Sequence, residues 1–406
     1  MPDADPEIWD VIVVGAGPAG STAARVAAEA GARVLLIDRA TFPRYKTCGG
    51  GITGRSLRAM PDAARATFEA DISEFGLSRE GGDRVMLHAD TPFLGMVQRE
   101  HFDQALVDAA AAVGVEFRDA TAMRGLEEVE AGIRIRLAGE GAGGELFARV
   151  VVGADGSSGR TSGYVGVEFA ASDLGLEVEV EAIDHEWAST AMFDWGKDAG
   201  AYAWLFPKHD SLTIGVIQRT GVPDATRAYL ELWLRQLGLA GATRLRESGH
   251  MTRWRSRTSP LRRGTVLVAG EAAGLLEPWT REGISFALRS GAMAGAAAAS
   301  AAAAARTGDV TARDHALDGY VAAIERELAP DLVAGAAMLK VLERFPGSLH
   351  CFLAHTRRGR RLFVALCRGG PRVSALVHHP LIRVAGPLLA RRPRRATPTR
   401  ARLDAA

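Results

Sequence analysis

The chain has 406 residues, a formal net charge of +1 and a hydrophobic fraction of 47%, which allows two domains and a large core. Cys48, Cys351 and Cys367 are too few and too scattered for a disulfide framework or a zinc site. The acidic N-terminus enters an apolar run by residue 10, so we expect no signal peptide. No apolar run reaches the roughly 18 residues that a membrane span needs. The few scattered cysteines fit a reducing compartment, and we expect a cytoplasmic protein.

The glycine-rich stretch 15–20, GAGPAG, lies between elements typical of dinucleotide-binding proteins. The apolar run 11–14 before it predicts a buried strand. The alanine-rich stretch 21–28 after it predicts a helix, and a second apolar run, 34–37, ends on Asp38. Such a βαβ unit, with an acid about 20 residues past the glycines, indicates dinucleotide binding. The alternative is a glycine-rich turn in another kind of α/β protein, and the motif does not separate FAD from NAD.

Each residue of this motif has an expected role. Gly15 permits the tight turn, Gly17 lets a pyrophosphate approach the backbone, and Gly20 lets the helix pack on the strand. The helix N-terminus offers free N–H groups and a partial positive charge to the phosphates. We expect Asp38 to hydrogen-bond a ribose hydroxyl.

A second candidate site begins at Cys48. The glycine triplet 49–51 lets the backbone lie flat against a planar ligand. Cys48 is either a small buried residue or a thiol that faces the ligand ring. Arg99 stands where a strand is followed by a helix, which suits a phosphate or flavin contact as well as an ordinary surface charge.

Two later stretches carry the same type of signal. The apolar run 150–153 predicts a buried strand, and Asp155 follows it at the edge where ligands bind in open α/β sheets. The run 265–269 predicts another strand. Gly283 and Ile284 then open a helix whose N-terminus can bind an anion or a carbonyl.

The remaining pattern predicts a second domain. Residues 55–80 have helical spacing, whereas residues 161–258 contain alternating strands of an antiparallel sheet. Tyr202, Trp204 and Phe206 share one face of a strand and form either core or a greasy ligand wall. The predicted domains are an FAD-binding domain (1–80, 97–165, 256–335), a substrate domain (81–96, 166–255) and a helical, basic C-terminal region with a disordered end (336–406).

The C-terminal region is basic without interruption. No acid occurs between Glu343 and Asp404, and arginines alternate with the apolar stretches 362–366 and 381–384. This mixture suits a peripheral position on anionic lipid, at the inner face of the plasma membrane. A solvated basic helix or a disordered arm is the alternative. Nucleic acid is disfavoured, because no aromatic interleaving or known module accompanies the arginines.

Four stretches together resemble the FAD-dependent geranylgeranyl reductase family, within the wider class of flavoproteins built like p-hydroxybenzoate hydroxylase. They are GAGPAG with its acid, FPRYKTCGGG, REHFDQAL, and GEAAGLLEPWTREGI followed by FALRSG. YAWLFPK is similar to the family's substrate-sheet motif, and the likeness covers about residues 8 to 335. It implies an α/β fold with a Rossmann-like FAD-binding domain, an antiparallel substrate sheet and a helical C-terminal region.

The resemblance implies FAD as cofactor and an isoprenoid as substrate. The implied substrate contacts are Tyr202, Trp204, Phe206 and Trp279. Two departures are visible, because Asp38 replaces the usual Glu and Glu271 replaces the usual Asp, which makes a water-mediated contact of Glu271 with FAD an expectation. The implied cofactor contacts are Gly15, Ala16, Gly17, Gly20, Asp38, Arg39, Cys48, Gly49, Gly51, Arg99, Ala122, Asp155, Gly270, Glu271, Pro278, Gly283 and Ile284.

The implied reaction is saturation of an isolated alkene by hydride from reduced flavin, with Cys48 or Tyr202 as proton donor. NADPH or a ferredoxin would supply the electrons, and no histidine shows metal-ligand spacing. Three alternatives remain: an aromatic hydroxylase of the same fold, a flavin halogenase and a flavin-bound lipid carrier. The halogenase is disfavoured because YAWLFP lacks a Trp-x-Trp-x-Ile-Pro motif. Intact motifs around the flavin ring argue against a mere carrier.

Overall fold

A mostly parallel sheet carries the nucleotide-binding motifs. The computed structural model describes residues 7–138, 144–181, 185–370 and 372–377. Five strands pair in parallel in the order β18, β11, β1, β2, β8, and the hairpin β9–β10 joins at β11. Buried β-branched side chains fill β1 and β11, as the sequence predicts. The bounds are β1 (Ile8–Val14), β2 (Val34–Ile37), β8 (Glu116–Arg118), β9 (Met123–Val129), β10 (Gly132–Leu137), β11 (Glu145–Gly153), β17 (Arg262–Arg263) and β18 (Val266–Val268).

Small residues bring two helices of this domain into very close contact. A Cβ atom added at Gly291 of α7 would lie 2.2 Å from the carbonyl oxygen of Ala19 in α1. One added at Gly295 would lie 2.3 Å from that of Ala23. The glycines of α7 therefore let a helix from late in the chain complete the N-terminal βαβ unit. The helices are α1 (Pro18–Glu29), α4 (Arg99–Ala111), α5 (Arg160–Val165), η1 (Gly270–Ala273), α7 (Ile284–Arg306) and α8 (Val310–Glu327).

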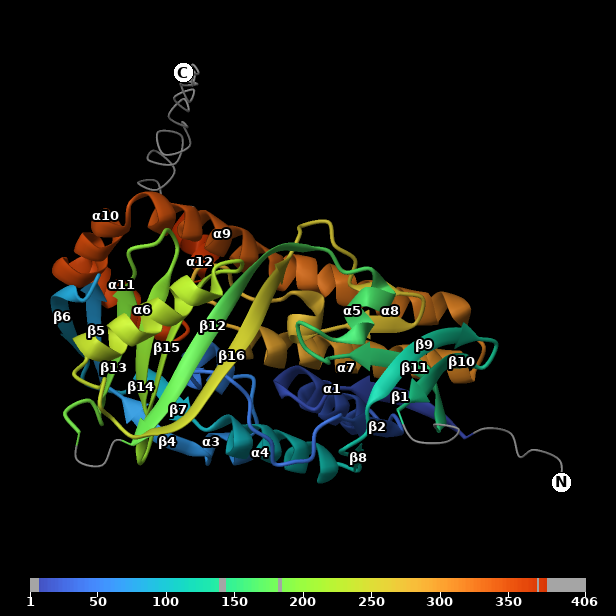
Figure 1. Cartoon of the computed structure of the whole chain (residues 1–406). Helices are drawn as coiled ribbons and strands as arrows, with labels where there is room; N and C mark the ends of the chain where they lie inside the picture. Colours follow the sequence, from blue (N-terminus) through green and yellow to red (C-terminus); the bar gives the residue numbers. More distant parts are fainter. Residues whose placement is uncertain (1–6, 139–143, 182–184, 371, 378–406) are drawn as a thin grey trace, which may run out of the picture.

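The second sheet lies beside the first (Figure 1) and runs in the order β16, β12, β15, β14, β13, β5, β6. Its pairs are antiparallel except β13–β5, which is parallel. One face packs on α6 (Pro223–Gln236), and the aromatic side chains of β14 lie on the other face. The bounds are β5 (Glu74–Arg79), β6 (Gly82–His88), β12 (Phe169–Glu181), β13 (Thr190–Trp195), β14 (Tyr202–Pro207), β15 (Ser211–Arg219) and β16 (Arg244–Arg255).

The helical interpretation of residues 55–80 is wrong for its second half. Only α2 (Gly54–Leu57) and α3 (Asp62–Arg65) are helical, and each is a single turn. β5 enters the second sheet already at Glu74, rather than at residue 81, because it pairs with β13 far along the chain. β7 (Leu94–Val97), expected in that sheet, instead joins β3 (Gly51–Ile52) and β4 (Phe68–Ile72) in a small separate sheet.

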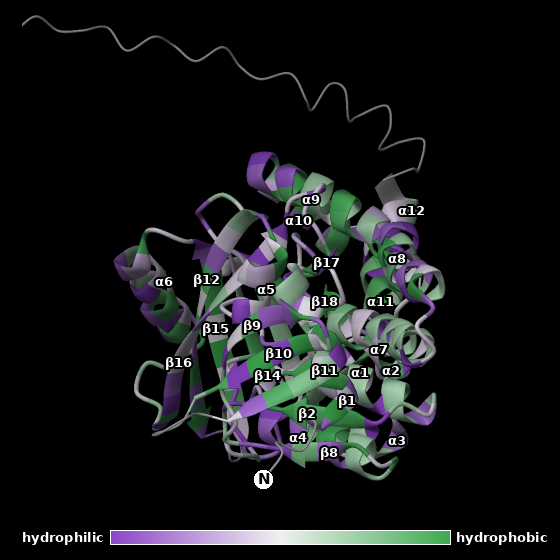
Figure 2. Ribbon diagram, turned by 90° about the vertical axis from the view of Figure 1, so that its right-hand side faces the viewer, coloured by the Kyte–Doolittle hydropathy of each residue, from purple (hydrophilic) through white to green (hydrophobic). Residues whose placement is uncertain are grey.

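The C-terminal region is helical, and its described part ends at Val377. No helix among residues 7–138, 144–181, 185–370 and 372–377 is long and apolar enough to cross a membrane. The expected disordered end falls outside the described residues. Figure 2 shows the contrast between the hydrophobic strands β1 and β2 and the mixed surface helices. The elements are α9 (Ala329–Arg344), α10 (Pro346–His350), η2 (Cys351–His355), α11 (Arg357–Cys367) and α12 (Val373–Val377).

Candidate active site

A cavity of about 920 Å³ extends from the carboxyl end of the parallel sheet to the aromatic face of the second sheet. Its volume is at the upper end of the range for small-molecule and cofactor sites. The first part lies at the ends of the adjacent strands β1 and β11. The next parallel strands of the sheet along the chain, β2 after β1 and β18 after β11, lie on opposite sides of this pair, and ligands of open α/β sheets usually bind at such a point. Seventeen of the predicted contact residues line it: Gly15, Gly17, Asp38, Arg39, Cys48, Gly49, Gly51, Arg99, Ala122, Asp155, Tyr202, Trp204, Phe206, Glu271, Trp279, Gly283 and Ile284.

The glycine loop has the geometry that the sequence predicts. Gly15 has φ +100°, and a Cβ there would lie 2.4 Å from the carbonyl oxygen of Ala154. A Cβ at Gly20 would lie 1.7 Å from the Gly15 oxygen, so only glycine lets α1 pack this closely on the loop. Among the described residues, a Cβ added at Gly17 would meet only the Arg44 guanidinium within 4 Å, and no side chain of these residues caps the first turn of α1. This N-terminus therefore leaves room and N–H donors for a phosphate.

Asp38 organises the neighbouring end of the cavity. Its Oδ2 accepts a hydrogen bond from the Ala16 N–H at 2.7 Å, and its Oδ1 accepts one from the Ala40 N–H at 2.9 Å. Each carboxylate oxygen can accept a second bond, so a ribose hydroxyl can still be bound there. Ala122 and the exposed Arg39 lie along the same stretch of wall.

Two arginines meet one buried carboxylate beside the glycine loop. Arg99 binds Asp103 with Nε and Nη2, at 2.8 and 2.7 Å, and Arg44 reaches the same carboxylate at 2.8 Å. Burial disfavours the charge of Arg99, but Asp103 and Cys48 outweigh that effect and raise its pKa above the ordinary value. Nη1 of Arg44 is buried and has no hydrogen-bond partner within the described part of the chain. This donor beside Gly17 fits a cofactor pyrophosphate.

The glycine triplet is needed for a reason that the sequence does not show. A Cβ at Gly49 would lie 2.7 Å from the Phe206 ring. A Cβ at Gly50 would lie 2.8 Å from Nζ of Lys208, which donates a hydrogen bond to the Gly49 carbonyl. Lys208 is fully buried, and this desolvation lowers its pKa. The aromatic strand and its lysine therefore pack directly on the triplet.

Cys48 lies between the two parts of the cavity, and Glu177 of β12 fixes its backbone. Glu177 Oε1 accepts hydrogen bonds from the Cys48 N–H at 2.8 Å and from the Tyr45 hydroxyl at 2.9 Å. Its Oε2 is buried without a hydrogen-bond partner in the described ranges, and burial raises the pKa of this carboxyl. The Cys48 Sγ accepts from the Gly50 N–H at 3.4 Å.

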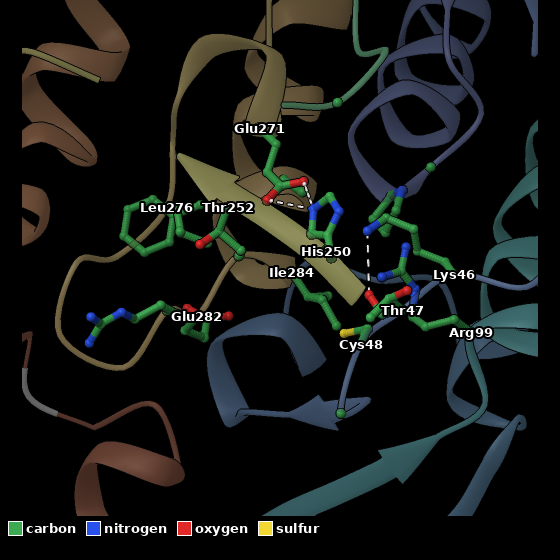
Figure 3. A pocket seen from close by; sticks show the side chains of 18 of the residues that line it. Lys46, Thr47, Cys48, Arg99, His250, Thr252, Glu271, Leu276, Glu282 and Ile284 are labelled. Carbon is green, nitrogen blue, oxygen red and sulfur yellow. Dashed lines mark hydrogen bonds and ion pairs between the residues drawn. The ribbon is translucent and has the colours of Figure 1, made fainter. Parts of the chain in front are cut away.

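Glu271 points toward His250 of β16, as Figure 3 shows. His250 Nε2 lies 3.1 Å from its carboxylate. Burial opposes ionisation of Glu271, but the hydrogen bond and charge of His250 outweigh it and lower the pKa. Lys46 lies near the pair, and desolvation lowers its own pKa. The longer side chain of Glu thus has a protein partner at the position where Asp is usual.

The second part of the cavity is an aromatic wall. Phe193 packs on Tyr202 and Phe206, each at 5.5 Å between ring centroids, and Tyr202 lies 6.1 Å from Trp204. The Tyr202 hydroxyl donates to the Thr280 carbonyl at 2.6 Å, and burial raises its pKa. Further lining residues are Leu94, Trp195, Leu276, Trp279, Phe363, Leu366 and Cys367.

Some predicted contacts do not line the cavity. Ala16, Gly20, Gly270 and Pro278 lie behind the wall. Asp155 lines it, but its carboxylate accepts from the Thr161 N–H at 3.1 Å and from its hydroxyl, so it holds the start of α5.

Sequence reasoning missed several polar lining residues. Arg44 and Lys46 fall inside the FPRYKTCGGG stretch, so that motif could have signalled them. Lys208 ends YAWLFPK and does not line the cavity, but it supports the Gly49 carbonyl from behind. Glu177 and His250 carry no local signal, because their positions depend on the pairing of distant strands.

Comparison with known proteins agrees with this geometry. Residues 9–327 match the model of the FAD binding domain family, which places the chain among FAD-binding flavoproteins. A geranylgeranyl diphosphate reductase of Rhodobacter capsulatus is 31% identical over 70% of this chain and 74% of its own length. A digeranylgeranylglycerophospholipid reductase of Methanothermobacter thermautotrophicus is 31% identical over 75% of this chain and 79% of its own.

The fold agrees as well. The crystal structure of a geranylgeranyl bacteriochlorophyll reductase-like protein from Thermoplasma acidophilum superposes with a TM-score of 0.77 at 19% identity, covering 91% of this chain and 98% of that one. The chain belongs to the FAD-dependent geranylgeranyl reductase family and is an FAD-dependent oxidoreductase.

Proposed function

We propose that the protein saturates isolated carbon–carbon double bonds of an isoprenoid chain. The observation that carries this proposal is the continuity of the cavity: the aromatic wall of β13 and β14 meets the glycine triplet directly, with Cys48 at the junction. An apolar chain on that wall would lie against the stretch that the family uses for the flavin ring. The names of the two relatives, which act on geranylgeranyl and digeranylgeranyl compounds, support an isoprenoid substrate.

The residues at this junction would hold the flavin ring of FAD, which, when bound and reduced, would supply a hydride. An isolated alkene has no carbonyl that the protein could polarise, so the residues of the wall must act by holding it in place and excluding water. Gly15, Gly17, Asp38 and Arg44 would hold the nucleotide part, and Cys48, Gly49 and Gly51 would hold the ring. Trp204, Phe206 and Trp279 would hold the substrate.

The second carbon of the alkene needs a proton. Cys48 is one candidate donor, because it stands at the junction of the two parts. Glu177 is another, since its raised pKa and its unpartnered Oε2, taken over the described residues, favour the protonated form. The Tyr202 hydroxyl is a weaker candidate because its proton is already donated to the Thr280 carbonyl.

Mass spectrometry of prenyl compounds after incubation with dithionite-reduced protein tests the proposal. We expect a gain of two hydrogen atoms per double bond, and Cys48→Ala or Glu177→Gln should slow it if that residue is the donor. A gain of one oxygen atom, with NADPH consumed in air, would instead indicate the hydroxylase. Retention of the compound without any change would indicate a carrier.

We further propose that α11 contacts anionic lipid, which would bring the enzyme to a prenyl-lipid substrate. Arg357, Arg358, Arg360 and Arg361 are exposed on this helix, while Phe363 is buried against the cavity. Co-sedimentation with vesicles of anionic and neutral lipid tests this, and the arginine-to-glutamine variant of α11 should lose only the anionic binding.

Anaerobic mixing of the oxidised protein with NADPH or reduced ferredoxin identifies the electron donor by flavin bleaching.

A further inference from the structure

The structure brings together three metal-ligating residues that the sequence keeps far apart. Asp83 is the second residue of β6, His350 ends α10 and His355 ends η2. Their ligand atoms all lie within 4.8 Å of one another. None of the three lines the cavity, so the cluster is separate from the cofactor and substrate site.

The distances within this cluster match a coordination sphere. His355 Nε2 lies 3.0 and 3.1 Å from the two carboxylate oxygens of Asp83. His350 Nε2 lies 3.2 Å from the carboxylate and 3.0 Å from the Asp83 backbone oxygen. Neighbouring ligands of a tetrahedral zinc ion with bonds of about 2.0–2.1 Å are separated by about 3.3 Å. An ion can therefore be inserted with small movements of the side chains.

The burial of the three residues is uneven in a way that suits a bound ion. The His350 side chain is 2% exposed and is held in place by the packing around it. Asp83 is 58% and His355 42% exposed, which leaves a route for the ion and a position for water. Two imidazoles and one carboxylate form a ligand set of borderline softness, which favours Zn²⁺ over Mg²⁺ or Ca²⁺.

We propose that Asp83, His350 and His355 bind one divalent transition-metal ion of the zinc type. The ion fastens the C-terminal helices to the β5–β6 hairpin. Phe363 of α11 packs on Phe75 of β5, with ring centroids 4.9 Å apart, and Phe363 also lines the substrate part of the cavity. The bound ion thus holds one wall of that cavity against the second sheet.

Calorimetric titration of Zn²⁺ into chelator-treated, untagged holoprotein tests the proposal, together with thermal melting. We expect one bound ion per chain and a rise in the melting temperature that EDTA reverses. Asp83→Asn and His355→Gln should each weaken binding by more than about tenfold and abolish the rise. Asn tolerates the positive φ of 44° at position 83, so this substitution does not strain the start of β6.

Two control variants separate this site from nonspecific binding. His315→Ala removes an exposed histidine of α8, and Cys351→Ser removes the exposed thiol beside His350. Both should bind Zn²⁺ like the wild type. His350→Ala risks unfolding because the side chain is buried, so the test depends on the two exposed ligands. Absence of saturable binding, or equal binding by all variants, would overturn the proposal and leave a simple His–Asp ion pair.

Discussion

The two parts of the cavity are built by different means. In the part around Gly15, which we propose for the cofactor and call the cofactor part, the backbone makes the site: at Gly15 and Gly20 a Cβ would collide with a carbonyl oxygen, and Gly17 leaves room for a Cβ beside Arg44. In the part around Tyr202 and Trp204, which we propose for the substrate, side chains make the site. Polar atoms such as Nε1 of Trp204 and of Trp279 are buried there without partners over the described ranges. Substitution in the first part should therefore remove cofactor binding, whereas substitution in the second should change rate, stability or selectivity.

The largest effect is expected at Gly15. Gly15→Ala places a Cβ 2.4 Å from the Ala154 oxygen on a residue with φ +100°, so the loop cannot keep its shape. We expect a purified protein without flavin absorbance that takes up no added FAD. Gly17→Ala is the matched variant, because only Arg44 lies near its Cβ, at 3.5 Å, and it should fold normally while binding FAD more weakly. Equal flavin content in the two variants would contradict this account.

A pH effect is expected at Glu282, at the start of α7 on the cavity wall. Burial raises the pKa of its carboxyl to about 7, whereas the unfolded value is about 4.3. The folded state therefore binds more protons, and the free energy of unfolding should fall as the pH rises from about 4.5 to 7, by at most about 3.5 kcal/mol. Denaturant unfolding across that range checks it. Glu282→Gln, which can still accept from the Ser285 N–H, should remove this slope.

A smaller effect is expected at Arg44. Arg44→Met removes a buried guanidinium beside Gly17, and the loss of a charged hydrogen bond should weaken FAD binding by about 1.5–3 kcal/mol. Fluorescence titration of the apoprotein with FAD measures it. The exposed Arg124 of β9, which does not line the cavity, supplies the control, since Arg124→Met should leave the affinity unchanged. Equal losses in the two variants would remove Arg44 from the pyrophosphate site.

The smallest effect is expected at Tyr202. Tyr202→Phe removes one hydrogen bond to the Thr280 carbonyl and should destabilise the protein by about 1 kcal/mol. Prenyl reduction should remain near the wild-type rate, since the ring stays in the wall. Single-turnover kinetics check this, and a rate loss as large as that of Cys48→Ala would make Tyr202 the proton donor.

The sequence predicts the cofactor part well, because its signals are local. The buried runs 11–14 and 150–153, the glycines between strand and helix, and Asp38 all lie within short stretches, and each is where the structure requires it. The second sheet is less predictable. The run 74–79 forms a local hairpin with β6, but it joins the second sheet by pairing in parallel with residues 190–195, and no local pattern predicts that distant partner.

The dependence on partners far along the chain also explains why the sequence did not predict some polar residues of the structure. Glu177 belongs to an alternating strand, whose pattern predicts that its acidic side chains face solvent. In the structure the Glu177 side of β12 faces the cavity, because α6 covers the other side. His350, His355 and Asp83 come together only because the C-terminal helices return to the start of β6. The spacing of these residues along the chain therefore does not predict their contacts.

The crossing of α1 and α7 has a consequence for biosynthesis. While the first 280 residues are being made, the βαβ unit lacks the helix against which its own helix rests, at Ala19 and Ala23. A nascent chain on the ribosome thus carries its nucleotide motif long before it can use it. Flavin uptake is expected to wait until Gly291 and Gly295 have left the exit tunnel.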